Sequence, residues 1–157
     1  MMYSIAIFNI CIKKKLINKE VFLIMKGLLL TRDGMEIVLK EIEVSEGKNQ
    51  LEDMQNYIGG YIEIPYIKKI FNDNEILVIL NEEGKLLDLE PTCILKKDEQ
   101  IYDTFNGNVL FLSAEGENII GLNKKQINII KNEIQLVSDF VIKNNENIIT
   151  LATLELD

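Results

Sequence analysis

The stretch Gln55–Pro65, QNYIGGYIEIP, decides how the middle of the chain folds. The apolar residues from Leu51 to Ile58 recur at spacings that place them on one face of a helix. The pair Gly59–Gly60 stands where this periodicity stops, which is typical of a helix C-cap. The residues after the pair alternate as a strand does, and the closing proline indicates a strand end or a sheet edge. The sequence therefore predicts a helix that ends at the glycines and leads directly into a strand.

Strand and turn signals continue on both sides of this stretch. The apolar run from Lys26 to Thr31, the turn Arg32–Gly34 and the extended run that follows it predict a β-hairpin. Further strands are predicted at Glu75–Leu80, Lys85–Leu89, Val109–Leu112 and Asn147–Leu156.

The longest helix is expected to begin at Asn123. Asn123 and Gln126, three residues on, resemble a capping box, and an apolar stripe follows from Ile127 to Val137. Two helices among several short strands predict an α+β domain, with a mainly antiparallel sheet of five to seven strands.

Residues 1–24 differ in character from the remainder. A short apolar run, Ile5–Ile12, precedes a triple lysine, whereas a secretory signal has its positive charge first. The run is too short to span a membrane. Residues 1–24 form either an extra edge strand or a segment appended ahead of a natural start at Met25, and we favour the appended segment. Residues 25–157 are expected to form one domain.

The composition excludes several kinds of chemistry. The 157 residues include no histidine, which removes imidazole bases and the commonest metal ligand. The two cysteines, Cys11 and Cys93, lack the spacing of a zinc site, and no cofactor is expected. Residues 1–24 sum to a charge of +3, which leaves −11 for the remainder out of a net −8. An acidic body argues against direct nucleic-acid binding, which depends on clustered lysine and arginine.

Several segments carry a family resemblance in their order and spacing: Met25–Leu29, Leu51–Pro65, Leu77–Leu86, Asp103–Leu112 and Gly121–Asn123. Across roughly residues 25 to 130 the chain resembles the domain-of-unknown-function family 3846. The resemblance implies a small protein of a phage, plasmid or other mobile element of bacteria. It implies no catalytic residues.

The candidate ligand- or partner-binding residues lie in two segments and comprise Tyr57, Gly59, Gly60, Tyr61, Asp103, Asn106 and Asn108. The glycines would let a ligand approach the backbone, although a helix C-cap explains the first equally well. The tyrosines could stack a base or a ribose, or simply pack half-buried. Polar side chains near residue 106 could line a pocket, although an Asn-Gly turn also accounts for Asn106 and Gly107.

We expect a non-enzymatic binding protein, an acidic inhibitor of a host defence system of the anti-restriction or anti-CRISPR type. Its partner would be a host or phage protein with a basic surface, met in the cytoplasm and without membrane contact. The alternatives are a sponge for a nucleotide immune signal and a metal-dependent nucleotide enzyme. A sponge normally needs several basic residues for phosphates, and Arg32 is the only arginine in the chain. A homodimer through the Tyr61–Pro65 edge is also expected to be possible.

Overall fold

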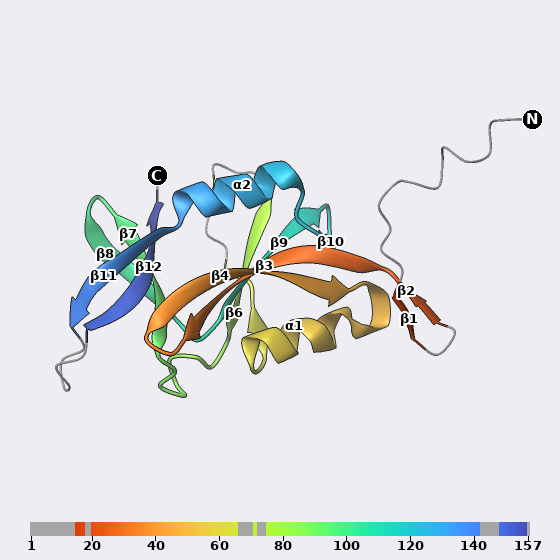
Figure 1. Cartoon of the computed structure of the whole chain (residues 1–157), viewed down its shortest axis with the longest axis horizontal. Helices are drawn as coiled ribbons and strands as arrows, with labels where there is room; N and C mark the ends of the chain where they lie inside the picture. The colour runs from red at the N-terminus through yellow and green to blue at the C-terminus, as the bar shows by residue number, and fades with distance from the viewer. Residues whose placement is uncertain (1–14, 18–19, 66–70, 72–74, 142–147, 157) are drawn as a thin grey trace, which may run out of the picture.

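The computed structural model describes residues 15–17, 20–65, 71, 75–141 and 148–156. Figure 1 shows a central sheet with a helix on each side and a second sheet at one end. The helices are α1 (Gln50–Ile58), α2 (Lys124–Glu133) and a short 3-10 helix, η1 (Gly47–Asn49).

The central, six-stranded sheet has the order β4-β3-β9-β6-β5, with β10 beside β9, and its pairs are antiparallel. Its strands are β3 (Ile24–Asp33), β4 (Glu36–Ser45), β5 (Ile62–Glu63), β6 (Ile76–Asn81), β9 (Val109–Glu115) and β10 (Asn118–Ile120). The hairpin β3–β4 is paired over its whole length, from Ile24 opposite Ser45 to Asp33 opposite Glu36.

The second sheet has four strands in the order β11-β12-β7-β8. Its strands are β7 (Pro91–Lys97), β8 (Gln100–Asn106), β11 (Gln135–Val141) and β12 (Ile148–Leu156). The pair β12–β7 is parallel, and its neighbours are antiparallel. A separate two-stranded hairpin, β1 (Lys15–Ile17) and β2 (Glu20–Phe22), precedes the central sheet.

Both faces of the central sheet are covered, which explains why its inner strands β6 and β9 consist mostly of apolar residues. Alternate side chains of one strand enter two different cores: Leu28 and Leu30 of β3 belong to one, and Leu29 belongs to the other. The first core lies against α2 and the second sheet, and includes Phe111 and Ile130. The second core lies against α1. The strands β3, β4, β6 and β9 have residues in both cores and therefore hold two layers together.

The fold prediction is confirmed in its main points. The α+β class, the antiparallel majority and the two helices are as expected, and the central sheet has the predicted size. Gly59 ends α1 in the left-handed conformation, at φ 77° and ψ 29°, as a C-cap glycine does. The capping box at the start of α2 is also present, since Asn123 and Gln126 exchange hydrogen bonds of 2.9 and 3.0 Å.

Two local predictions are wrong. Lys85–Leu89 is not a strand, because residues 82–88 form a series of turns. The second helix ends at Glu133 rather than near Val137, and Gln135 already pairs with Thr153 of β12. The helical spacing of the apolar residues therefore continues past the helix, where pairing with β12 decides the conformation instead.

Among the described residues, no helix is long and apolar enough to cross a membrane.

Candidate functional site

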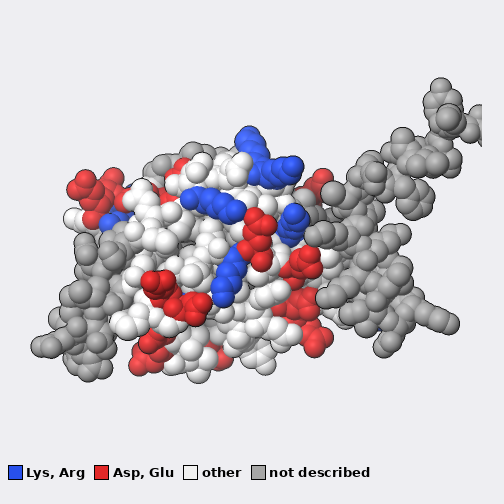
Figure 2. All heavy atoms as spheres, in the orientation of Figure 1, with Lys and Arg blue, Asp and Glu red and all other residues white. Residues whose placement is uncertain are grey.

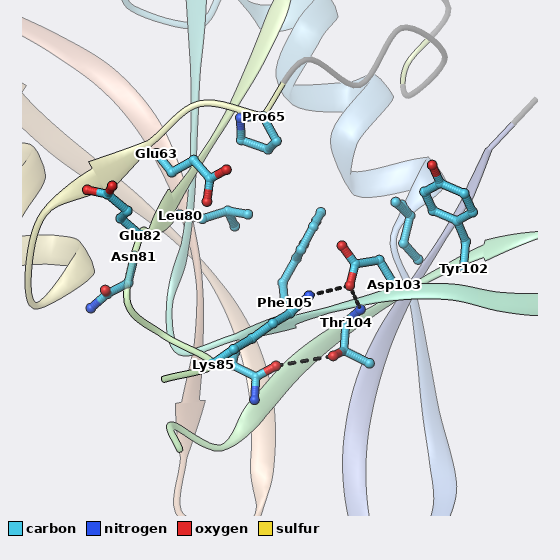
Figure 3. A pocket seen from close by; sticks show the side chains of 12 residues that line it. Glu63, Pro65, Leu80, Asn81, Glu82, Lys85, Tyr102, Asp103, Thr104 and Phe105 are labelled. Atoms are coloured by element: carbon cyan, nitrogen blue, oxygen red, sulfur yellow. Dashed lines mark hydrogen bonds and ion pairs between the residues drawn. The ribbon is translucent and has the colours of Figure 1, made fainter. Parts of the chain in front are cut away.

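Among the described residues, one hollow lies where an edge of the central sheet faces an edge of the second sheet. It has a volume of about 320 Å³, and we call it the cleft. One wall comes from the end of β5 and from β6, and the other comes from β7 and β8 (Figure 3). Its lining residues are Glu63, Pro65, Leu80, Asn81, Glu82, Lys85, Leu95, Tyr102, Asp103, Thr104, Phe105 and Asn106.

The floor of the cleft is apolar and its rim carries charge. Leu80, Leu95 and Phe105 are buried and belong to the core between the two sheets. Glu63 stands on the opposite wall from Asp103, which forms an ion pair with Lys85 (Figure 3). Among the described lining residues, three are carboxylates and one is a lysine. The cleft therefore combines an apolar base with a net negative rim.

A bulge in β8 places Tyr102 at this rim. Leu95 lies opposite Asp103 and Lys96 lies opposite Ile101, so Tyr102 is an extra residue on β8. Bulges commonly redirect a side chain beside a binding site. The tyrosine side chain is 66% exposed although the residue lines the cleft.

Residues 82–90, which we call the acidic loop, continue from the cleft between β6 and β7. The loop is held by backbone hydrogen bonds, including Leu87 N to Glu83 O at 2.8 Å and Leu89 N to Gly84 O at 3.0 Å. Gly84 lies so close to β8 that an added Cβ would stand 2.5 Å from the carbonyl oxygen of Asn106. The loop is therefore fixed tightly against the second sheet.

This fixed loop presents apolar side chains to solvent. Leu86 is 85% exposed and Leu87 is 57% exposed. The loop also carries four carboxylates: Glu82, Glu83, Asp88 and Glu90. A rigid, exposed leucine pair among carboxylates is typical of a protein-binding surface, because little conformational entropy is lost when a partner covers it.

Asn81 joins the cleft to the end of α1. Its side-chain oxygen accepts from the backbone of Glu83 at 2.8 Å, and its nitrogen lies 3.5 and 3.4 Å from the carbonyl oxygens of Ile58 and Gly59. Gly60 packs on the same side chain, since an added Cβ would lie 2.8 Å from the Asn81 nitrogen. Gly60 therefore accommodates Asn81, which accounts for the second glycine of the pair.

The structure separates the candidate residues into three groups. Asp103 and Asn106 line the cleft, where Asn106 also donates to the carbonyl oxygen of Leu89 at 2.8 Å. Gly59, Gly60 and Tyr61 line a different, shallow hollow with Gln55 and Asn56.

Tyr57 and Asn108 form the third group, and their contacts are structural. Asn108 donates to the carbonyl oxygen of Tyr57 at 2.8 Å and accepts from the hydroxyl of Thr31 at 2.7 Å. The Tyr57 hydroxyl donates to the carbonyl oxygen of Glu43 at 2.9 Å. Burial raises the pKa of this phenol, and the nearby Asp53 carboxylate adds to the effect. These contacts fasten α1 to the central sheet.

Sequence reasoning missed Glu63, Asn81 and Lys85 as members of one site. Their positions in the sequence carry only turn and strand signals. The residues meet because β5 pairs with β6 and the acidic loop crosses to β7, which is a property of the topology.

Arg32 serves as a link between the sheets. Its guanidinium donates to the carbonyl oxygen of Pro91 in β7 at 2.7 Å and to that of Thr150 in β12 at 3.3 Å. Nε lies 3.1 Å from a Glu90 carboxylate oxygen, as an ion pair without hydrogen-bond geometry. The side chain is only 13% exposed. These contacts occupy the chain's single arginine, the residue best suited to bind a phosphate.

Among the residues that the structure describes, no group of three or more Asp, Glu or Cys is placed to hold a metal ion. Cys93 is buried, and burial raises the pKa of its thiol to about 12.

Comparison with known proteins identifies one family. No curated protein and no solved structure matches the chain. A family model described as a domain of unknown function, DUF3846, matches residues 25–135. The match begins in β3, includes the cleft and the acidic loop, and ends at the first residue of β11. Since it covers more than half of the 157 residues, the chain belongs to the DUF3846 family.

Proposed function

We propose that this protein is a non-enzymatic binding protein of a phage or mobile element, which inhibits a host defence system in the cytoplasm. The observation that carries the proposal is the acidic loop, which holds Leu86 at 85% exposure among carboxylates beside the acidic cleft. Its partner would be a protein with an apolar recess surrounded by lysine and arginine. The mobile-element setting is the one that the family resemblance implies.

The proposal places the interaction at one surface rather than over the whole acidic body. Figure 2 shows lysine and arginine interspersed with aspartate and glutamate on the face in view. Such a face gives no single negative field to a partner. The acidic loop, by contrast, concentrates four carboxylates and one lysine within nine residues. We therefore expect the loop to steer a basic partner, and the exposed leucines to supply apolar contact once it arrives.

The proposal favours an inhibitor over a nucleotide sponge. A sponge needs basic groups in its pocket to balance phosphate charge. The cleft is instead lined by Glu63, Glu82 and Asp103, and Lys85 is already paired with Asp103. Arg32 is used in the contact between the sheets.

The test is recovery of a partner from bacterial host lysate with tagged protein, at low and at physiological salt. We expect a basic nuclease or methylase subunit at low salt, with reduced recovery at physiological salt because exposed charges are screened. The variant Leu86→Ser should lose the partner. Leu51→Ser should keep it, because Leu51 is also exposed, at 51%, but lies on α1.

A charge-matched pair of variants tests the electrostatic part. Glu82→Lys/Glu83→Lys reverses two charges in the acidic loop. Glu115→Lys/Glu117→Lys makes the same change at the exposed end of β9 and in the turn that follows it. Only the first should abolish recovery of the partner and the protection of phage plating on a defended host. Equal losses in both variants would contradict a localised docking surface.

A further inference from the structure

The edge of the second sheet is open at the cleft. In the order β11-β12-β7-β8, the strand β8 stands last, and within the described chain it pairs only with β7. An edge strand carries backbone N–H and C=O groups that point away from its neighbour, and an added strand can bind to them. The residues of β8 from Tyr102 to Asn106 line the cleft. The acidic loop packs on β8 at Asn106, so the open part of the edge is the stretch of β8 before Asn106. This open stretch lies beside a hollow that is large enough for side chains.

The backbone of β8 already makes a contact of the kind that an added strand would make. The N–H of Thr104 donates to the carboxylate of Asp103 at 2.7 Å (Figure 3). In an edge strand, an oxygen in this position takes the place of a carbonyl from a neighbouring strand. Asp103 is in turn held by Lys85, in an ion pair whose side chains are 43% and 58% exposed. Because the pair is exposed, separating it costs little.

The charge of the cleft restricts what binds there. Glu63 faces Asp103 across the cleft, and Glu82 adds a third carboxylate. When an incoming basic side chain takes over the pairing with Asp103, Lys85 is released toward solvent. The apolar floor of Leu80 and Phe105 suits the aliphatic stem of a lysine or arginine.

We propose that the cleft binds an extended segment of the partner protein, which adds to β8 as a fifth strand and places a lysine or arginine between Glu63 and Asp103. This inference rests on the proposed function, since it specifies how the partner is held. A second copy of this chain fits the edge poorly. Asp98, Glu99 and Asp103 lie in or beside β8, so two copies paired through this strand would bring like charges together.

The inference is tested with a display library of random linear nine-residue peptides, selected on the full-length protein. We expect the selected peptides to share one central lysine or arginine, with apolar residues at alternate positions. Binding should fall at least about tenfold in Glu63→Lys/Asp103→Lys, because the basic side chain then meets like charge. The matched control, Glu115→Lys/Glu117→Lys, should bind as the unmodified protein does. If the first variant fails to fold by circular dichroism, Glu63→Gln/Asp103→Asn replaces it.

The mode of binding is tested by amide hydrogen exchange in the peptide complex. Backbone pairing should slow exchange in β8, with Thr104 among the protected amides. The inference is overturned if no peptide is enriched, if the enriched peptides lack a basic residue, or if protection appears away from β8. If recovery of the partner still depends on Leu86 but the library yields no peptide, this inference is wrong and the proposed function stands. If the Leu86→Ser variant recovers the partner as well as the unmodified protein does, the proposed function is wrong.

Discussion

The two ends of the acidic loop differ in how they use charged side chains. At its C-terminal end, Glu90 lies 3.1 Å from Arg32 of β3, whose side chain is 13% exposed and donates to backbone carbonyls of the second sheet. Near its N-terminal end, Lys85 is 58% exposed and forms an ion pair with Asp103, whose side chain is 43% exposed. The first contact joins two sheets, and the second lines a cleft. The comparison teaches that charge supports the fold where it is buried and paired with the backbone, and remains available for recognition where it is exposed.

The largest expected effect comes from breaking the loop itself, with Gly84→Ala. The new Cβ would lie 2.5 Å from the Asn106 carbonyl oxygen and 3.3 Å from that of Asn81, and both are backbone atoms. The loop must move away from β8, so we expect the free energy of unfolding to fall by about 3 kcal/mol. Urea unfolding followed by circular dichroism measures the loss.

Gly34→Ala is the matched control, because its φ is +62° with no atom within 4 Å of an added Cβ. It carries only the backbone strain of a left-handed residue, about 1 kcal/mol. Equal losses for the two alanines would mean that the acidic loop is not fixed by its approach to β8.

The next effect tests the buried side of the comparison, with Arg32→Met. This change leaves the carbonyl oxygens of Pro91 and Thr150 without the guanidinium, at an expected cost of about 2 to 3 kcal/mol. Arg32→Lys should restore less than half of the loss, since a single ammonium cannot reproduce the planar fork. Urea unfolding gives the stability, and recovery of the partner should be unchanged in the folded variants. A loss of binding at full stability would place Arg32 in the recognition surface instead.

Sequence reasoning succeeded where a local signal determines the structure. The C-cap at Gly59 and the capping box at Asn123 each depend on residues within one turn, so they were predicted and are confirmed. It failed where distant pairing decides. Gln135 lies in a helix-like pattern but pairs with Thr153. No strand was predicted at Thr92–Leu95, which lies in β7 between β8 and β12.

The candidate site divides in the same way. Of the polar residues predicted near the turn at residue 106, Asp103 and Asn106 line the cleft, whereas Asn108 contacts Thr31 and Tyr57. That the cleft binds a ligand or partner stays a prediction. Asn81 and Lys85 carried no distinguishing signal, because their role depends on a loop that crosses from one sheet to the other. The second glycine, Gly60, is explained by Asn81, a residue 21 positions away that sequence alone did not bring to it.

A third prediction concerns the interior between the sheets, beside the Arg32 contacts. Cys93 is buried in β7, and burial raises its thiol pKa to about 12 from an ordinary value of 9.0. Between these values the unfolded thiol loses its proton while the folded thiol keeps it. The free energy of unfolding should therefore fall as the pH rises from 9 toward 12, by at most about 1.4 kcal/mol per pH unit.

The test compares the Cys11→Ser protein, as the parent, with the same protein carrying Cys93→Ala. The free energy of unfolding of each is measured by urea unfolding at several pH values. The alanine variant should lack this part of the slope, whatever its absolute stability. The single thiol of the parent should also react with iodoacetamide only as fast as the protein unfolds. Rapid labelling of the folded protein at pH 8 would show that the interface between β7 and its neighbours is open.

The smallest expected effect on stability is that of Lys85→Met, which removes the exposed ion pair with Asp103. Exposed pairs contribute between nothing and about 1 kcal/mol, so the urea midpoint should barely move. The affinity for basic peptides, by contrast, should rise. With Lys85 gone, Asp103 and Glu63 have no competing ammonium in the cleft, and basic peptides should bind more tightly.

Titration of the selected peptides by calorimetry at low salt measures this gain, and raising the salt should diminish it. Asp103→Asn is the complementary change: it removes the same ion pair but also removes the carboxylate that attracts the peptide. The two variants should therefore change the free energy of unfolding equally little, whereas Lys85→Met should tighten peptide binding and Asp103→Asn should weaken it. If both variants weaken binding, Lys85 itself contacts the partner. The lysine then belongs to the recognition surface and does not compete with the partner for Asp103.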